Sequence, residues 1–249
     1  MSRSIAQTQS PQAAVPSASR GIFGRIAGVI FSPAVTLREV ARDPRPAGMI
    51  VFVSGVLALS GAIFLSTDVG KLAWLDEAMR QADSFGLPVT DAQYAQLERM
   101  RDYAAYLVLV QDLLGVPLLI LAVAGIVKAV SAVIFDTEAT FKQTLGVMCA
   151  STVILALRQL FVLPLNYVRE SMTGATNLAI FLPLLRQAGL LARFLGAIDL
   201  FVVWWLLVLA SGLSALYRRS ARSMALALLG LYGVMALGFA LTLMFVGGA

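Results

Sequence analysis

The sequence contains no histidine and only one cysteine, Cys149, among its 249 residues. Without histidine, the chain has no imidazole to bind a metal, to shuttle protons or to serve in a histidine-dependent catalytic triad. A single cysteine forms neither an intramolecular disulfide bond nor a cysteine-based zinc site. No serine, lysine or carboxylate pair has a recognisable catalytic spacing, so we expect a protein that is not an enzyme and has no cofactor.

Charged residues are scarce as well, because they make up 13% of the sequence whereas 59% of it is apolar. A water-exposed surface cannot be built from so few charges, so the composition predicts an integral membrane protein. The formal net charge is +5, and the basic residues are scattered between apolar runs. This distribution favours contact with the lipid bilayer, in particular with anionic lipids of the inner leaflet, and argues against binding to nucleic acid.

Five apolar segments are long enough to cross a bilayer, which requires about 20 residues in an α-helix. They cover residues 47–66, 104–127, 143–165, 197–217 and 224–246. The predicted fold class is therefore all-α, an integral membrane bundle of five transmembrane helices within residues 47–246. Small residues on the first and last spans are expected to allow close helix packing. They are Ser54, Ala58, Ala62, Gly230, Gly233 and Gly238.

Basic residues in the connecting segments predict the orientation, because short loops rich in lysine and arginine stay in the cytoplasm. With the N-terminus inside, eleven basic residues lie on the cytoplasmic side and seven lie outside. The short turn with Arg218, Arg219 and Arg222 is the strongest single indication. Since the number of spans is odd, we expect a cytoplasmic N-terminus and an external C-terminus.

The segment before the first span has two parts. Residues 1–20 are rich in serine, glutamine, alanine and proline, which predicts a disordered cytoplasmic tail. Residues 21–46 predict two amphipathic helices that meet at Ser32, a good N-cap, and Pro33. We expect these helices to lie flat on the inner leaflet; the alternative is that they pack against the bundle as ordinary cytoplasmic helices. The expected lipid contacts are Phe23, Arg25, Phe31 and Arg38.

The outer loop between the first two spans, residues 67–103, is long and carries helix signals of its own. A polar helix is predicted for residues 73–85, where a glycine and a proline then stop it. Thr90, followed three residues later by Gln93, resembles a capping box. We therefore expect the second membrane helix to begin in water near Asp91 and to enter the bilayer about three turns later.

Three charged residues lie within the predicted spans, namely Asp112, Arg158 and Asp199. A charged group at the centre of a membrane helix costs on the order of 2.5 to 3.5 kcal/mol, so we expect these residues to form pairs. Asp112 and Arg158 lie at the same estimated depth and can pair, whereas Asp199 is an alternative partner for Arg158. The cluster is interpreted either as a structural latch between helices or as part of an ion or proton path.

Several short stretches stand in a characteristic order around the predicted spans. They are residues 30–33, 36–40, 43–44, 139–145 and 195–204. The last stretch contains Asp199, Phe201 and Trp204 in an Asp-x-Phe-x-x-Trp pattern. Together these stretches resemble the Yip family, the Ypt/Rab-interacting membrane proteins. The resemblance implies five spans, a cytoplasmic N-terminus and membrane-organising or partner-binding activity without catalysis.

Eukaryotic members of this family are associated with Rab-type GTPases and vesicle traffic. The chain lacks the long acidic or aromatic N-terminal tail of that setting, so we expect a bacterial relative in the cytoplasmic (inner) membrane. The expected function is that of a membrane-organising scaffold or adaptor, with other membrane proteins or a second copy as further partners. The alternative is a small transporter or channel subunit that uses Asp112, Arg158 and Asp199.

Overall fold

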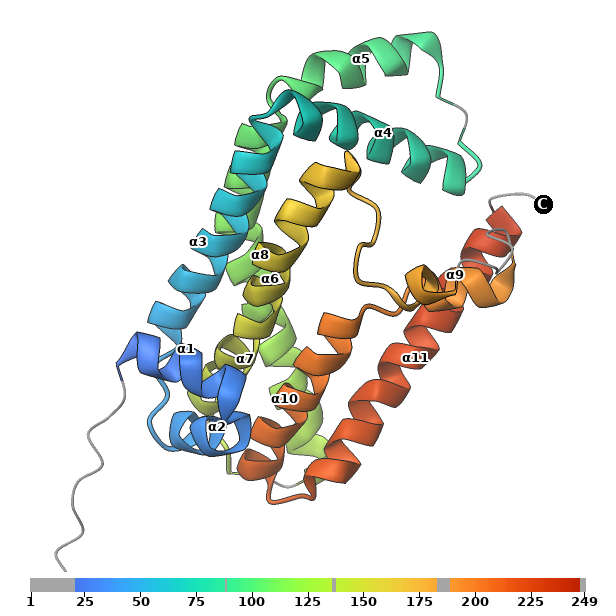
Figure 1. The fold of residues 1–249 in the computed structure, drawn as a ribbon. Helices are drawn as coiled ribbons and strands as arrows, with labels where there is room; N and C mark the ends of the chain where they lie inside the picture. Colours follow the sequence, from blue (N-terminus) through green and yellow to red (C-terminus); the bar gives the residue numbers. More distant parts are fainter. Residues whose placement is uncertain (1–20, 88, 136–137, 183–188, 247–249) are drawn as a thin grey trace, which may run out of the picture.

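The computed structural model describes residues 21–87, 89–135, 138–182 and 189–246 of the chain. The predicted disordered tail, residues 1–20, lies outside these ranges. The described part is a bundle of helices without a β-strand (Figure 1). Its helices are α1 (Ile22–Phe31), α2 (Pro33–Arg42), α3 (Pro46–Leu65), α4 (Asp68–Ser84), α5 (Asp91–Arg101), α6 (Ala104–Phe135), α7 (Phe141–Ser151), α8 (Val153–Arg169), the 3-10 helix η1 (Leu178–Phe181), α9 (Leu190–Gly196), α10 (Leu200–Tyr217) and α11 (Ala221–Val246).

Within the described ranges, five helical segments are long and apolar enough to cross a membrane, as the sequence predicted. They are Pro46–Leu65, Ala104–Ile134, Phe141–Arg169, Leu200–Tyr217 and Ala221–Phe245. The second span is longer than expected, because α6 continues without a break to Phe135. The prediction of an all-α membrane bundle with five spanning helices is confirmed.

The third span lies at the centre of the bundle and consists of α7 and α8, which meet at Thr152. At this junction Ser151 Oγ donates a hydrogen bond to the backbone oxygen of Met148 at 2.8 Å. Thr152 Oγ1 donates in the same way to Cys149 at 2.7 Å, and such bonds to the preceding turn bend helices. The apolar window of this span is 67% buried, against 11% for the second span, so the other spans enclose it.

Glycine permits a close contact between α2, α7 and α10. A Cβ atom on Gly212 of α10 would lie 2.5 Å from Val147 Cγ1 on α7 and 3.2 Å from Leu37 Cδ1 on α2. Val147 and Leu37 are both fully buried. Because a larger residue at position 212 would push these side chains apart, the three helices approach one another only with glycine there.

The small residues predicted as packing surfaces behave in two ways. Ser54 and Ala58 of α3 are buried, as expected. A Cβ atom at Gly230, Gly233 or Gly238 of α11 would meet no atom within 4 Å, so the expectation was wrong for packing within this chain. The reason is that α11 lies at the edge of the bundle, where it packs against α10 and α9, and its glycines line the open side.

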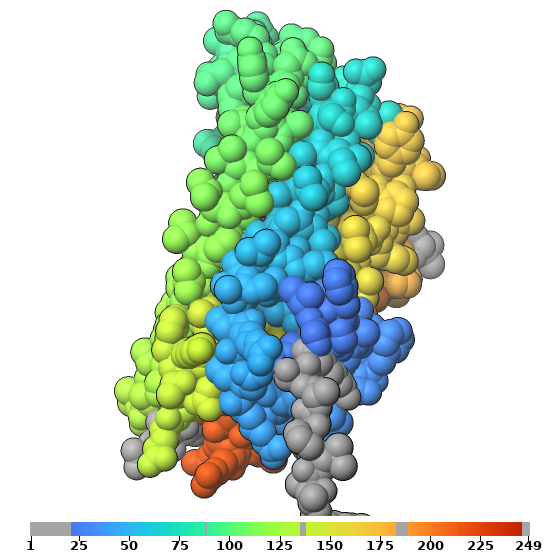
Figure 2. Space-filling model, turned by 90° about the vertical axis from the view of Figure 1, so that its left-hand side faces the viewer, coloured from blue at the N-terminus to red at the C-terminus, as the bar shows by residue number. Residues whose placement is uncertain are grey.

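The two N-terminal helices meet where the sequence predicted, with α1 ending at Phe31 and α2 beginning at Pro33. Ser32 makes no side-chain cap, however. The buried face of α2 packs against α7 and α10, and α1 contacts α7 and α8. Figure 2 shows α1 on the outer surface of the bundle, beside α3. We call the end of the bundle that carries α2 and the α10–α11 turn the basic end.

The opposite end carries α4 and α5 above the spans (Figure 1). The predicted polar helix is present but longer, because Thr67 Oγ1 caps α4 by accepting a hydrogen bond from Gly70 N. The capping box of Thr90 and Gln93 is confirmed at the start of α5. The second membrane helix does not begin there, since α5 ends at Arg101 and α6 starts separately at Ala104, after a turn.

A Gly212→Ala substitution is expected to destabilise the protein by about 1–3 kcal/mol, the usual cost of overpacking a dense core. Its matched control is Gly230→Ala, because a methyl group at that position meets no atom within 4 Å. The measurement is the thermal unfolding midpoint of both purified variants in one detergent. Equal midpoints for the two variants would show that α2, α7 and α10 are not in tight contact.

Candidate functional site

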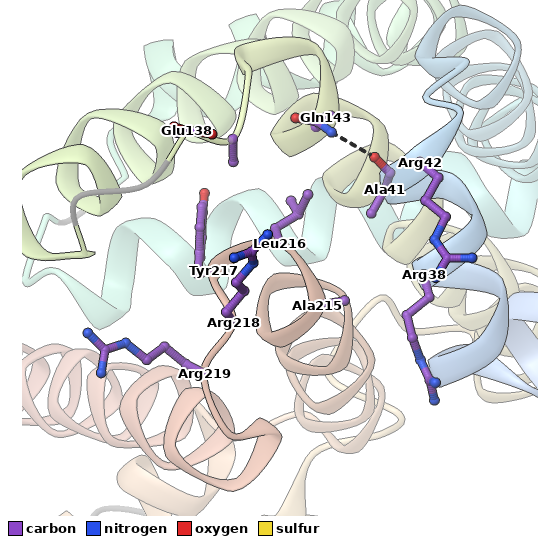
Figure 3. Close-up of a pocket in the computed structure, with 11 residues that line it drawn as sticks. Arg38, Ala41, Arg42, Glu138, Gln143, Ala215, Leu216, Tyr217, Arg218 and Arg219 are labelled. Atoms are coloured by element: carbon purple, nitrogen blue, oxygen red, sulfur yellow. Dashed lines mark hydrogen bonds between the residues drawn. The ribbon is translucent and has the colours of Figure 1, made fainter.

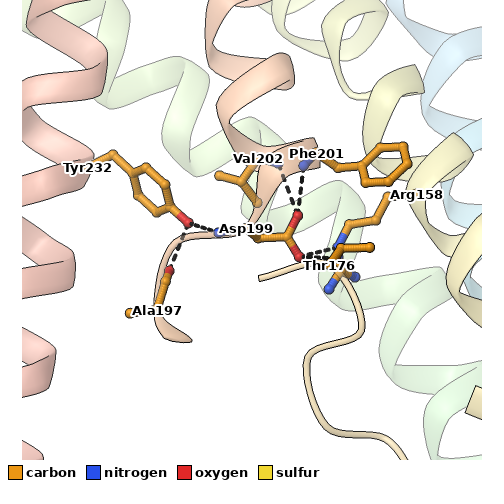
Figure 4. A network of polar contacts seen from close by, with 7 residues as sticks. All are labelled: Arg158, Thr176, Ala197, Asp199, Phe201, Val202 and Tyr232. Atoms are coloured by element: carbon orange, nitrogen blue, oxygen red, sulfur yellow. Dashed lines mark hydrogen bonds and ion pairs between the residues drawn. The ribbon is translucent and has the colours of Figure 1, made fainter. Parts of the chain in front are cut away.

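Asp199 is the centre of a polar cluster at the start of α10 (Figure 4). It is the residue before the helix, and its Oδ1 atom accepts hydrogen bonds from the backbone N–H groups of Phe201 at 2.8 Å and Val202 at 3.3 Å. These two N–H groups have no partner within the helix, so the carboxylate caps it. A negative charge at this position also interacts favourably with the helix dipole.

The second carboxylate oxygen of Asp199, Oδ2, binds Arg158 and Thr176. Arg158 Nε on α8 donates to it at 2.8 Å, and Thr176 Oγ1 donates at 2.5 Å. The side chain of Asp199 is 14% exposed and that of Arg158 is 29% exposed, so the protein partly encloses the pair. Of the two partners that the sequence allowed for Arg158, the structure therefore shows Asp199.

Tyr232 connects α11 to the same cluster. Its hydroxyl group accepts a hydrogen bond from the backbone N–H of Asp199 at 3.0 Å and donates one to the backbone oxygen of Ala197 at 2.9 Å. The cluster thus joins α8, the segment around Thr176, α10 and α11. Sequence reasoning missed Tyr232 and Thr176, because a tyrosine or a threonine in a sequence gives no sign that it will bind a carboxylate far away along the chain.

Asp112 is not part of this cluster. It lies on α6, which packs against α3 and α7, and its Oδ2 atom lies 3.8 Å from where a Cβ atom on Gly61 of α3 would be. Among the residues that the structure describes, Asp112 has no ion-pair partner. The expected pair of Asp112 with Arg158 is therefore corrected, because α6 does not bring that carboxylate to α8.

The arrangement around Asp199 favours the latch interpretation over an ion path. Both carboxylate oxygens accept two hydrogen bonds each, so their acceptor positions are already used. Next to it, the rings of Phe161 and Phe201 lie 5.5 Å apart between centroids, and Phe201 and Trp204 lie 6.0 Å apart. The Asp-x-Phe-x-x-Trp pattern therefore combines a helix cap with an aromatic contact between α8 and α10.

Arg25 of α1 is not exposed, which corrects its prediction as a lipid contact. Its guanidinium group donates to the backbone oxygen of Asp43 at 3.1 Å and to Asp43 Oδ2 at 3.0 Å, and Arg45 binds the same carboxylate. A buried guanidinium requires such partners. Desolvation alone would raise the pKa of Asp43. The hydrogen bond and the positive charge of Arg45, followed by the charge and the hydrogen bond of Arg25, outweigh desolvation and hold the pKa of Asp43 below its ordinary value of 3.8. The ionised carboxylate thus fixes α1 to the segment before α3.

Phe23, Phe31 and Arg38, the other predicted lipid contacts, are exposed, which is the position that lipid contact requires. Phe23 is 78% exposed and Phe31 is 83% exposed, although both belong to a helix whose other face is buried. Their contact with lipid stays a prediction.

A pocket of about 830 Å³ opens at the basic end (Figure 3). We call it the basic pocket, and it is lined by Arg38, Ala41, Arg42, Glu138, Ala139, Gln143, Ala215, Leu216, Tyr217, Arg218 and Arg219. Arg38 and Arg42 lie on one side of the opening, and Arg218 and Arg219 lie on the other (Figure 3). The sequence did not predict this pocket, because its walls come from three segments that are far apart in the chain.

Metal binding has no support from the described residues, because no group of three or more histidine, cysteine, aspartate or glutamate residues in them is placed to hold an ion. The two candidate sites are thus the cluster around Asp199 and the basic pocket.

Removing the Asp199 carboxylate is expected to destabilise the protein by about 2 kcal/mol, because Asp199→Ala loses both the helix cap and the ion pair. Asp199→Asn keeps an acceptor for the cap and is expected to lose less. The matched control is Asp112→Asn, which breaks no ion pair and should leave the thermal unfolding midpoint in detergent nearly unchanged. A control that unfolds as early as Asp199→Asn would contradict the assignment of the latch to Asp199.

Comparison with known proteins agrees with the arrangement of the helices. The family model of the Yip1 domain matches residues 27–244, which begin within α1 and end within α11. Neither the curated proteins nor the solved structures that were searched contain a match. The matched region includes all five spanning segments except the last residue of the fifth, together with Asp199 and the basic pocket. The chain is an integral membrane protein that belongs to the Yip1 domain family.

Proposed function

We propose that this protein is a non-enzymatic membrane scaffold or adaptor that acts through its N-terminal helices and its helix bundle. The proposal rests mainly on the exposure of Phe23 and Phe31 on a helix that is otherwise fixed to the bundle. Large apolar side chains on the outside of a helix favour insertion into the boundary between lipid headgroups and acyl chains. Because α1 is anchored by Arg25 and by packing, these side chains form a rigid apolar edge.

The buried faces of α1 and α2 determine how this edge is held. Thr36, Leu37, Val40 and Ala41 of α2 are buried against the bundle, and so are Gly28 and Val29 of α1. The two N-terminal helices therefore pack on the bundle, which was the second alternative raised by the sequence, and they also expose apolar groups, which supports the proposed contact with the leaflet. A scaffold of this kind senses or shapes one leaflet without moving a solute.

The orientation proposed from the sequence places the basic end in the cytoplasm of a bacterial cell, against the inner leaflet of the inner membrane. Arg38, Arg42, Arg218, Arg219 and Arg222 all belong to this end, where anionic lipids would attract them. A second copy of the chain or another membrane protein is a further proposed partner. The peripheral spans α6 and α11 are the least buried of the five spans.

The alternative of a transporter or channel subunit receives less support from the geometry. The three residues on which this alternative depends do not form one site, since Asp112 lies on α6 while Arg158 and Asp199 bind each other. An ion path would need acceptor or donor groups that are available to a moving ion, and the oxygens of Asp199 are already engaged.

The proposed orientation predicts which end of the bundle is accessible from outside the cell. In a Cys149→Ala background, a single cysteine at Ser220 should be protected from a membrane-impermeant thiol reagent in intact cells, because the basic turn stays inside. A cysteine at Ser84 of α4 should react. Labelling of Ser220→Cys together with protection of Ser84→Cys would reverse the orientation.

The proposed lipid contact predicts where α1 lies relative to the bilayer. We expect fluorophores on Phe23→Cys and Phe31→Cys, in the same Cys149→Ala background, to be quenched in proteoliposomes by lipids brominated near the headgroup. Leu59→Cys, an exposed position on α3, is the lipid-facing reference, and Asp91→Cys, an exposed position at the start of α5 outside the spans, is the reference for water. Quenching at positions 23 and 31 no stronger than at 91 would place α1 in water and reject the proposal. Ion flux in these proteoliposomes that disappears with Arg158→Gln would support the transporter alternative instead.

A further inference from the structure

We propose that the basic pocket binds the phosphate-bearing headgroup of an anionic glycerophospholipid, one lipid molecule per chain. This inference deepens the proposed function and rests on it, since it assigns a defined lipid site to the end of the bundle that carries α1 and α2. It differs from a general attraction to anionic membranes, because the site is a bounded cavity with its own residues.

The charge of the lining selects an anionic ligand. Four arginines line the pocket together with one acidic residue, Glu138, so positive charge predominates. Arg42 and Arg218 are exposed, and their side chains make no hydrogen bond or ion pair with the described residues. Arg38 uses its Nε atom to bind the backbone oxygen of Ala34 at 2.9 Å, which orients its guanidinium group. Arginine binds phosphate oxygens through two parallel hydrogen bonds, so these side chains suit a phosphate group.

The walls of the pocket are already fixed to one another. Gln143 Nε2 on α7 donates a hydrogen bond to the backbone oxygen of Ala41 on α2 at 3.0 Å. The hydroxyl groups of Thr144 on α7 and Tyr217 on α10 lie 3.2 Å apart in a buried hydrogen bond. Since α2, α7 and α10 are also in close contact at Gly212, the ligand does not have to order the site when it binds.

The position of the pocket favours a lipid headgroup over a soluble phosphate compound. The pocket lies where two spanning segments end, because the third span begins at Phe141 and the fourth ends at Tyr217. Lipid headgroups occupy this level of a bilayer. Apolar side chains flank the same end, since Val35 of α2 and Phe141 are exposed, so acyl chains find apolar contacts beside the phosphate site. A volume of about 830 Å³ is ample for such a headgroup.

The test uses the full-length protein in dodecyl maltoside micelles that contain increasing amounts of dioleoyl phosphatidylglycerol. Native mass spectrometry counts the lipid molecules retained per chain, and the titration gives an apparent affinity. We expect one retained phosphatidylglycerol in the wild type and roughly tenfold or more weaker retention in Arg42→Gln/Arg218→Gln, because two charge-assisted contacts are lost. Dioleoyl phosphatidylcholine should be retained less than phosphatidylglycerol.

The matched control is Lys142→Gln/Arg222→Gln. It removes two positive charges from the same end of the bundle, but neither residue lines the pocket. This variant should retain phosphatidylglycerol like the wild type, and equal loss in both double variants would show general charge attraction and overturn the proposal. Glycerol 3-phosphate and inorganic phosphate form a second arm, and displacement of the lipid by millimolar amounts of either would overturn the assignment to a lipid.

Folding of the variants is monitored separately by their thermal unfolding midpoints without added lipid. If the fluorophores on Phe23→Cys and Phe31→Cys are not quenched, the leaflet contact of α1 is rejected, while the retention of lipid by the pocket is unaffected. If instead the pocket shows no selectivity for phosphatidylglycerol, the quenching of these fluorophores is unaffected. Failure of this inference is therefore distinguishable from failure of the proposed function.

Discussion

The close packing of α2 and α10 against α7 determines the geometry of the basic end. Gly212 brings α10 against Val147 and Leu37, and Gly146 of α7 lies so close to Pro44 that an added Cβ atom would be 2.9 Å from the proline Cβ. These contacts hold α2 in place although it is not a spanning helix. They also place the arginines of α2 opposite those of the α10–α11 turn, which creates the basic pocket.

Polar groups serve different purposes at the two ends of the fourth span. At its start, Asp199 caps the helix and binds Arg158 and Thr176, so its oxygens are fully engaged. Near its end, Arg218 is exposed and its side chain reaches no partner among the described residues. An engaged polar group in an apolar protein stabilises the fold, whereas an exposed cluster of one sign is available to a ligand. This contrast is why we assign stability to the Asp199 cluster and binding to the basic pocket.

Physical roles can be given to several residues of the Yip1 domain pattern. Asp199 caps α10, and Phe201 contacts both Phe161 and Trp204. Thr140 and Gln143 form a capping box at the start of α7, and Gln143 also binds Ala41 of α2. These residues fix helix starts and contacts between helices within the region that the Yip1 domain model matches. The residues of α2 and of the α10–α11 turn that line the pocket add positive charge to this arrangement of helices.

The sequence by itself determined the features that depend on neighbouring residues. Apolar runs of sufficient length gave the five spans, and local spacing gave the capping box at Thr90 and the break before Pro33. A helix needs only its own residues to satisfy its backbone in a membrane, so these features are visible without a structure.

Only the tertiary structure decided which distant groups meet. It paired Arg158 with Asp199 and left Asp112 on α6, it buried Arg25 against Asp43, and it turned the glycines of α11 outward. It also assembled the basic pocket from α2, α7 and the end of α10. The physical reason is that depth along a helix follows from residue number, whereas the neighbour that each helix face meets depends on how all the helices pack together.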